Sequence, residues 1–139
     1  MRWNAMGLMM EMVPAIAPQI VTDDAPLVSA IINRQGFDAL EFAIATGALA
    51  TAGASFAILV QDGNDPALAD AETVSYWLEP PGEVTSTGSF TGAQPNSAFK
   101  IGYQGSKQYV RLTITPASNS GAANIGAVAI LGAPQVAPV

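Results

Sequence analysis

Apolar and polar positions alternate with a period of two over much of the chain. In residues 38–46, for example, Leu40, Phe42 and Ile44 would face one side and the intervening residues the other. This period is typical of a β-strand with one buried face. The pattern, together with short β-branched apolar runs, predicts strands at residues 27–33, 38–46, 55–61, 73–79, 98–103, 107–115 and 124–131.

Stretches that contain glycine and proline separate these predicted strands. The clearest turn signal is QGSK, residues 104–107, which would make residues 98–115 a hairpin. No amphipathic helix of useful length is visible, so the pattern predicts an all-β fold, an antiparallel β-sandwich or small barrel of jelly-roll-like layout. This body would cover residues 26–139. Residues 1–25 contain Pro14 and Pro18 and are predicted to form an extended N-terminal arm.

The chain is unusually poor in charge. Hydrophobic residues make up 50% of the 139 residues and charged residues only 12%, whereas an average domain carries about 25% charged residues. This low charged fraction indicates that partners cover part of the surface. The alternative is a solvated surface built of Ala, Gly, Ser and Thr.

The charges are also segregated along the chain. Residues 1–83 hold all 11 acids and two of the five bases, a net charge of −9, and residues 84–139 hold the other three bases, a net charge of +3. The acidic total of −6 argues against a nucleic-acid partner, because binding phosphates requires a basic surface. The two parts either neutralise each other within one fold or meet head to tail between copies.

The three bases of the second part lie on the predicted hairpin. Lys100, Lys107 and Arg111, with Tyr109, would face away from the core stripe of Val110, Leu112 and Ile114. They are candidates for a subunit interface with acidic surface on a neighbouring chain. The alternative is that the lysines protect a sheet edge from unwanted strand pairing.

The residues that usually carry catalysis are scarce. The chain has no cysteine and no histidine, which excludes disulfides, thiolate metal sites and Ser-His-Asp or Cys-His catalysis. Asp38 and Glu41 would face opposite sides of one strand, so they do not form an acid–base pair. The acidic residues of the loop DGNDPALADAE, residues 62–72, fit turn and capping roles better than a calcium loop. We therefore expect no enzyme activity, no metal and no cofactor.

Aromatic residues offer one alternative function. Trp77, Tyr76 and Phe90 could form a platform on which sugars stack, although alternation should separate Trp77 from Tyr76. Packing in the core or at an interface is the simpler interpretation.

All five methionines lie in the first twelve residues. Met6, Met9, Met10 and Met12 accompany Trp3 and Leu8 in the segment MRWNAMGLMMEMV. Methionine is flexible and polarisable and suits an adaptable docking surface. We therefore predict that this arm docks on a neighbouring subunit, with strand addition to the neighbour's sheet edge as one contact mode.

Four segments resemble a known family. AIINRQGFDALEFAIATGAL, FAILVQDGNDPALADAE, KIGYQGSKQYVRLTIT and AVAILGAP are similar to segments of head decoration, or cement, proteins of tailed bacteriophages. The resemblance covers roughly residues 27–134. It is a resemblance of pattern, so it carries over no active residues, and the arm departs from it.

The resemblance implies a structural virion protein that binds the outside of a tailed-phage capsid and stabilises the shell. The expected partners are the major capsid protein and copies of the same chain, as a homotrimer, with no nucleic acid and no membrane. The protein would be assembled in the host cytoplasm and reside on the capsid exterior. The alternatives are a tail or baseplate component and a carbohydrate-binding adhesin module.

Overall fold

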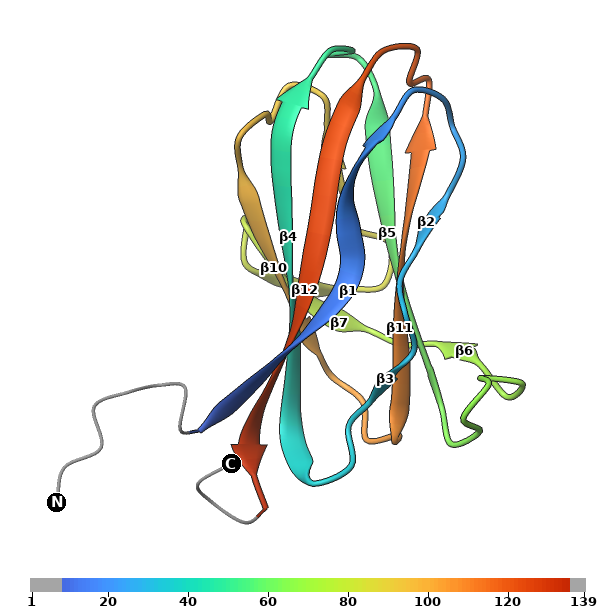
Figure 1. Ribbon diagram of the computed structural model, residues 1–139, viewed down its shortest axis with the longest axis vertical. Helices are drawn as coiled ribbons and strands as arrows, with labels where there is room; N and C mark the ends of the chain where they lie inside the picture. The colour runs from blue at the N-terminus through green and yellow to red at the C-terminus, as the bar shows by residue number, and fades with distance from the viewer. Residues whose placement is uncertain (1–8, 136–139) are drawn as a thin grey trace, which may run out of the picture.

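The computed structural model describes residues 9–135, and within that range the chain forms strands and loops without a helix. Two antiparallel sheets pack face to face around one core (Figure 1). The first sheet has the order β1-β12-β4-β10-β7-β8. The second has the order β2-β11-β5-β6, with β3 also paired to β11 and β9 to β5. The predicted all-β antiparallel fold is confirmed, and it is a sandwich.

The strands of the first sheet are β1 (Met10–Val21), β4 (Phe37–Leu49), β7 (Tyr76–Glu79), β8 (Glu83–Thr85), β10 (Ala98–Tyr103) and β12 (Ala123–Pro134). Those of the second are β2 (Leu27–Val28), β3 (Ile32–Asn33), β5 (Ser55–Gly63), β6 (Glu72–Thr73), β9 (Ser89–Thr91) and β11 (Tyr109–Ala117). Each stretch predicted as a strand contains one. Residues 27–33 form two short strands instead of a single one, because Ser29 Oγ accepts the N–H of Leu112 between them.

The N-terminal arm differs from its prediction. Residues 10–21, assigned to an arm outside the body, form β1, which pairs with β12 along its length. Ala15, Ile16 and Val21 are buried in the common core. The domain boundary after residue 25 is therefore wrong for the described part of the arm, although its extended conformation is correct.

Prolines explain why the pattern concealed this strand. Pro14 and Pro18 argue against a strand in general, but an edge strand tolerates proline where no neighbour needs its N–H. Strand β1 is such an edge, and its register with β12 shifts between Pro14 and Ile16 and again between Ile16 and Gln19. These shifts also interrupt the period-two pattern on which the prediction depended.

Aromatic side chains join the two sheets through the core. Phe90 of β9 stacks on Phe56 of β5, with ring centroids 4.9 Å apart, and on Phe99 of β10, at 4.7 Å. Phe56 and Phe90 belong to the second sheet and Phe99 to the first, so the stack crosses the space between them. Tyr76 of β7 adds a polar link, since its buried hydroxyl donates to the Ile58 carbonyl at 2.7 Å and accepts from Gly88 N at 2.8 Å.

The predicted hairpin is wrong as a pairing. Residues 98–103 and 109–117 are both strands, but β10 lies in the first sheet and β11 in the second. The QGSK segment thus crosses from one sheet to the other. Alternation still places Val110, Leu112 and Ile114 in the core, because it records burial and not the identity of the neighbouring strand.

Replacing a core residue of β11 should be costly. Leu112 is fully buried, so we expect Leu112→Ala to lower the free energy of unfolding by about 2–5 kcal/mol. Urea unfolding measures this difference. Thr115→Ala, at an exposed position of the same strand, is the control and should change it by less than about 0.5 kcal/mol. Equal losses for the two variants would contradict the assigned faces.

Candidate docking surface on the first sheet

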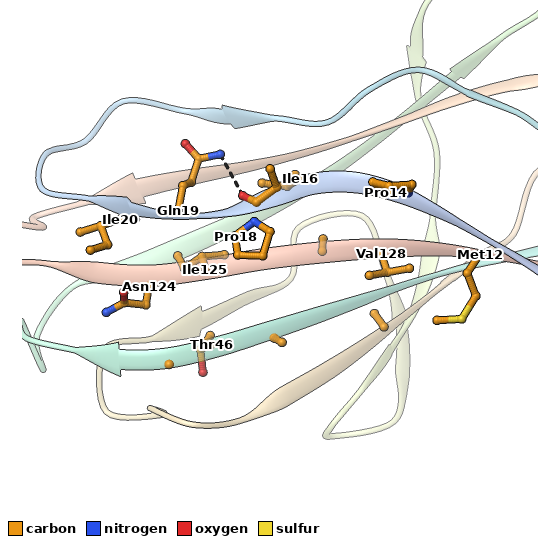
Figure 2. A pocket seen from close by; sticks show the side chains of 16 residues that line it. Met12, Pro14, Ile16, Pro18, Gln19, Ile20, Thr46, Asn124, Ile125 and Val128 are labelled. Carbon is orange, nitrogen blue, oxygen red and sulfur yellow. Dashed lines mark hydrogen bonds between the residues drawn. The ribbon is translucent and has the colours of Figure 1, made fainter.

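A groove of about 790 Å³ lies on the outer face of the first sheet, across β1, β12 and β4 (Figure 2). Strand β1 contributes Met12, Pro14, Ile16, Ala17, Pro18, Gln19 and Ile20, β4 contributes Ala43, Ala45, Thr46 and Gly47, and β12 contributes Asn124, Ile125, Gly126, Ala127 and Val128. We name it the β1–β12 groove. Sequence reasoning missed it, because the segments that form it are far apart in the chain.

Small residues make the floor of the β1–β12 groove. Gly126 of β12 pairs with Ala45 of β4, and Val128 pairs with Ala43. A Cβ atom at Gly126 would lie 3.1 Å from the Cα of Pro18, so glycine is what lets β1 approach β12 this closely. Beside this floor the side chains of β1 are larger, and the surface is therefore hollow along β12 and β4.

The described residues that line the β1–β12 groove include no charged side chain. Met12 and Ile20 at its two ends are 65% and 62% exposed, so they extend the apolar surface of the groove.

The polar side chains in the groove already have partners within the protein. Gln19 Nε2 donates to the Ala17 carbonyl at 3.1 Å, and Asn124 Nδ2 donates to the Ala48 carbonyl at 2.9 Å. Thr46 Oγ1 donates to the Gln94 carbonyl at 3.0 Å. Covering a polar group is costly mainly when it loses its hydrogen bonds. These groups would keep theirs under an apolar cover, so the groove suits an apolar partner.

The free edge of β1 is poorly suited to strand addition. Pro14 and Pro18 supply no N–H, and the Ala15 carbonyl accepts the N–H of Ala30 at 3.0 Å. An added strand needs a continuous row of donors and acceptors. The face of this sheet is therefore the better contact surface, and its edge is not.

An exposed tryptophan lies further across the same face. Trp77 is 37% exposed, and its Nε1 donates to Glu79 Oε2 at 3.1 Å. Lys100 Nζ lies 3.8 Å from the same oxygen, in an exposed ion pair that contributes little stability. Tyr76 and Phe90 are buried in the core. The alternative of a three-ring sugar platform is therefore wrong, core packing is correct for Tyr76 and Phe90, and the Trp77 ring remains on the surface.

The predicted basic face is divided between the two sheets. Lys100 lies on β10 of the first sheet, while Tyr109 and Arg111 begin β11 of the second. Lys107 lies in the segment that joins them. Arg111 Nη2 donates to Gln61 Oε1 at 2.8 Å, and its Nε is buried without a hydrogen-bond partner. These residues therefore do not share one face of a hairpin, and their role in a subunit contact stays a prediction.

The predicted docking residues of the N-terminal segment fall into two groups. Trp3, Met6 and Leu8 lie outside the described residues. Met9 is exposed, Met10 is half-buried at the start of β1, and Met12 lines the β1–β12 groove.

A polar cluster that the sequence did not indicate closes one end of the sandwich. Tyr103 at the end of β10 donates its hydroxyl to Asp62 Oδ2 on β5 at 2.7 Å and accepts the N–H of Lys107 at 2.9 Å. The Arg34 guanidinium lies 5.3 Å from the centre of the Tyr103 ring, and its Nε donates to the Lys107 carbonyl at 2.8 Å. The cluster fixes the segment that crosses between the sheets.

This cluster should give the fold a dependence on alkaline pH. Burial, and then the hydrogen bond to Asp62, raise the pKa of Tyr103 to about 12, whereas an unfolded tyrosine ionises near pH ~10. The unfolded chain therefore loses this proton first, and stability should fall as pH rises from about 10 to about 12. In Tyr103→Phe the fall should be smaller, as measured by urea unfolding at about pH 9 and about pH 11.5.

Some dependence should remain in Tyr103→Phe, because burial also raises the pKa of Tyr76. Tyr109→Phe is the control and should behave like the unsubstituted protein. An identical decline in Tyr103→Phe and the unsubstituted protein would argue against the hydrogen bond to Asp62.

The described residues meet neither the requirements of a metal site nor those of a membrane-spanning helix. Within residues 9–135, no group of three or more acidic, His or Cys side chains is arranged to hold a metal ion. The same residues include no helix long and apolar enough to cross a membrane. In the loop that follows β5, Asp65 accepts the N–H of Ala67 and Asp70 that of Asn64, as capping residues do.

Comparisons with known proteins identify the fold. No protein-family model and no curated protein matches the sequence. The solved structure of the SPBc2 prophage-derived protein YomS has a TM-score of 0.55 and 10% identity, over 87% of this chain and 94% of YomS. The PBSX exported protein XepA has a TM-score of 0.56 and 9% identity, over 97% of this chain but 40% of XepA. This chain thus spans less than half the length of XepA, and at these identities the similarity shows the fold alone.

Proposed function

We propose that this chain is a non-catalytic structural protein of a tailed-phage particle that binds the outside of the head shell and reinforces it. The observation that carries the proposal is the β1–β12 groove, an uncharged apolar surface on the outer face of a sheet. Removing apolar surface from water contributes a favourable free energy of roughly 25 cal/mol per Å². An uncharged groove whose Gln19, Thr46 and Asn124 side chains each already donate a hydrogen bond within the protein would suit an assembly contact.

Two further observations support a phage setting. The fold is shared with YomS, which is described as prophage-derived, and with the PBSX exported protein XepA. The four sequence segments described above resemble head decoration proteins. Neither observation specifies a position on the particle, so the capsid exterior belongs to the proposal.

The proposed mechanism is reinforcement by many weak contacts. The chain would associate with copies of itself, as a trimer, and bind the major capsid protein. A multivalent assembly binds far more tightly than each contact alone, because every later contact forms at high effective concentration. It would be assembled in the host cytoplasm and remain on the virion.

Copy number per particle tests the location. Quantitative mass spectrometry of purified particles should find the chain in a simple ratio to the major capsid protein. A few copies per particle would instead indicate the tail or baseplate. Absence from purified particles would refute the proposal.

A charge placed in the β1–β12 groove should weaken attachment. Ala45 is exposed on the groove floor, and burying a carboxylate without a partner costs several kcal/mol. We expect Ala45→Glu to weaken binding to isolated head shells by at least about 100-fold, measured by co-sedimentation. Ala57→Glu places the same charge at an exposed alanine of the second sheet and should bind within about twofold of the unsubstituted protein. Equal binding by Ala45→Glu would exclude the groove.

Binding of saccharides is a second candidate, favoured by the exposed ring of Trp77 beside Glu79 and Lys100. An indole face can stack on a sugar ring while the charged groups bind its hydroxyls. If this is correct, the chain should bind defined glycans on an array, and Trp77→Ala should abolish that binding while Trp77→Phe retains part of it. Glycan binding that survives in Trp77→Ala would exclude this site.

A further inference from the structure

We propose that the β1–β12 groove receives residues 1–8 of a second copy of the chain, with Trp3, Met6 and Leu8 as the side chains that enter it. The inference deepens the proposed function and rests on it in one respect, since it takes the groove to be an assembly contact. It names a second copy as the occupant of that contact, so Ala45→Glu would weaken shell attachment by removing the multivalent assembly.

The chemistry of the segment matches that of the groove. MRWNAMGL carries one charged residue, Arg2, and several large apolar ones. The floor at Ala43 and Ala45 has no side-chain atom beyond Cβ, so it leaves space that large side chains can occupy. Fully burying one such side chain contributes about 1.5–3 kcal/mol, and three together give a specific contact.

The length of the segment favours a second copy over the same chain. Along β1 the groove extends from Met12 to Ile20, a path of about 26 Å at roughly 3.3 Å per residue. Eight extended residues cover about the same distance. To enter its own groove, the segment would have to reverse direction next to Met10, where β1 begins beside Gly132. A reversal uses about four residues, and the remaining four would reach only about half of the groove.

The closed edge of β1 determines the mode of contact. Pro14, Pro18 and the bond between Ala30 and Ala15 leave few free backbone groups along that edge. The incoming segment is therefore held by side chains on the face of the sheet and not as an added strand. This contact replaces strand addition as the expected mode.

The dependence of self-association on salt concentration distinguishes this apolar contact from a contact between opposite charges. Each copy has a net charge of −6, so two copies repel each other at long range, while the described groove residues are uncharged. Salt screens this repulsion and does not weaken an apolar contact. Self-association should strengthen as salt is raised, whereas a head-to-tail contact between acidic and basic parts would weaken.

Sedimentation of the full-length chain with two variants tests the inference. Trp3→Asp damages the segment and leaves the groove intact, and Ala45→Glu does the reverse. Each variant alone should self-associate at least about 100-fold more weakly than the unsubstituted chain. Mixed together they should associate again, because the intact segment of one fits the intact groove of the other. Ala57→Glu is the matched control and should associate normally.

The mixing experiment distinguishes a segment that binds the groove of a second copy from a segment that binds the groove of its own chain. If the segment occupied its own groove, mixing the two variants would restore nothing. Urea unfolding checks that each variant is folded, and Met6→Asp and Ala45→Gln replace any that is not. The inference is overturned if the unsubstituted chain is monomeric at high concentration and high salt, if both variants associate normally, or if mixing fails.

The outcome is separate from that of the proposed function. A chain that is absent from purified particles but passes the mixing test refutes the phage role and leaves the self-contact intact. If the chain is abundant on purified particles but fails the mixing test, the self-contact is refuted and the phage role is left intact.

Discussion

The stack of Phe56, Phe90 and Phe99 is the contact on which the two-sheet structure depends. Its rings bring together strands of both sheets at 4.7–4.9 Å between centroids. Once these residues face inward, alternation determines the direction of every other side chain on their strands. Strand β10 must then present Lys100 outward and β5 must present Ala57 outward. Which side chains the outer faces present is thus a consequence of the inner packing.

The two outer faces have different chemistry. The outer face of the first sheet carries uncharged, mostly small or apolar side chains in the β1–β12 groove, and the Trp77, Glu79 and Lys100 group on its other half. On the second sheet, Arg111 of β11 donates a hydrogen bond to Gln61 of the neighbouring strand β5. A charged fraction of 12% leaves few charges to distribute, and the β1–β12 groove is a place where none lies among the described side chains. The low charge of the whole chain thus has a structural counterpart in one surface.

Strand β1 connects the fold to the proposed assembly. Its inward residues complete the core, while Met12 and Ile20 on its other side border the groove. Its prolines close the edge against strand pairing, a common way to prevent uncontrolled aggregation of sheets. In the proposed assembly, the same features would leave the face of the sheet as the contact surface, where side chains can give specificity.

The sequence alone predicted the all-β class and seven strand-forming stretches with their buried faces, because alternation such as that of Leu40, Phe42 and Ile44 is a local property that each strand carries by itself. The docking of the methionine-rich segment on a neighbouring subunit stays a prediction. Only the tertiary structure decided that β10 and β11 belong to different sheets, that residues 10–21 complete the first sheet, and that Ala45, Gly126 and Pro18 share one groove. Tyr103 and Asp62 were likewise joined only by folding, across 41 positions of the chain. The physical reason is that strand pairing is decided by the packing of the complete core, which no short stretch of sequence records.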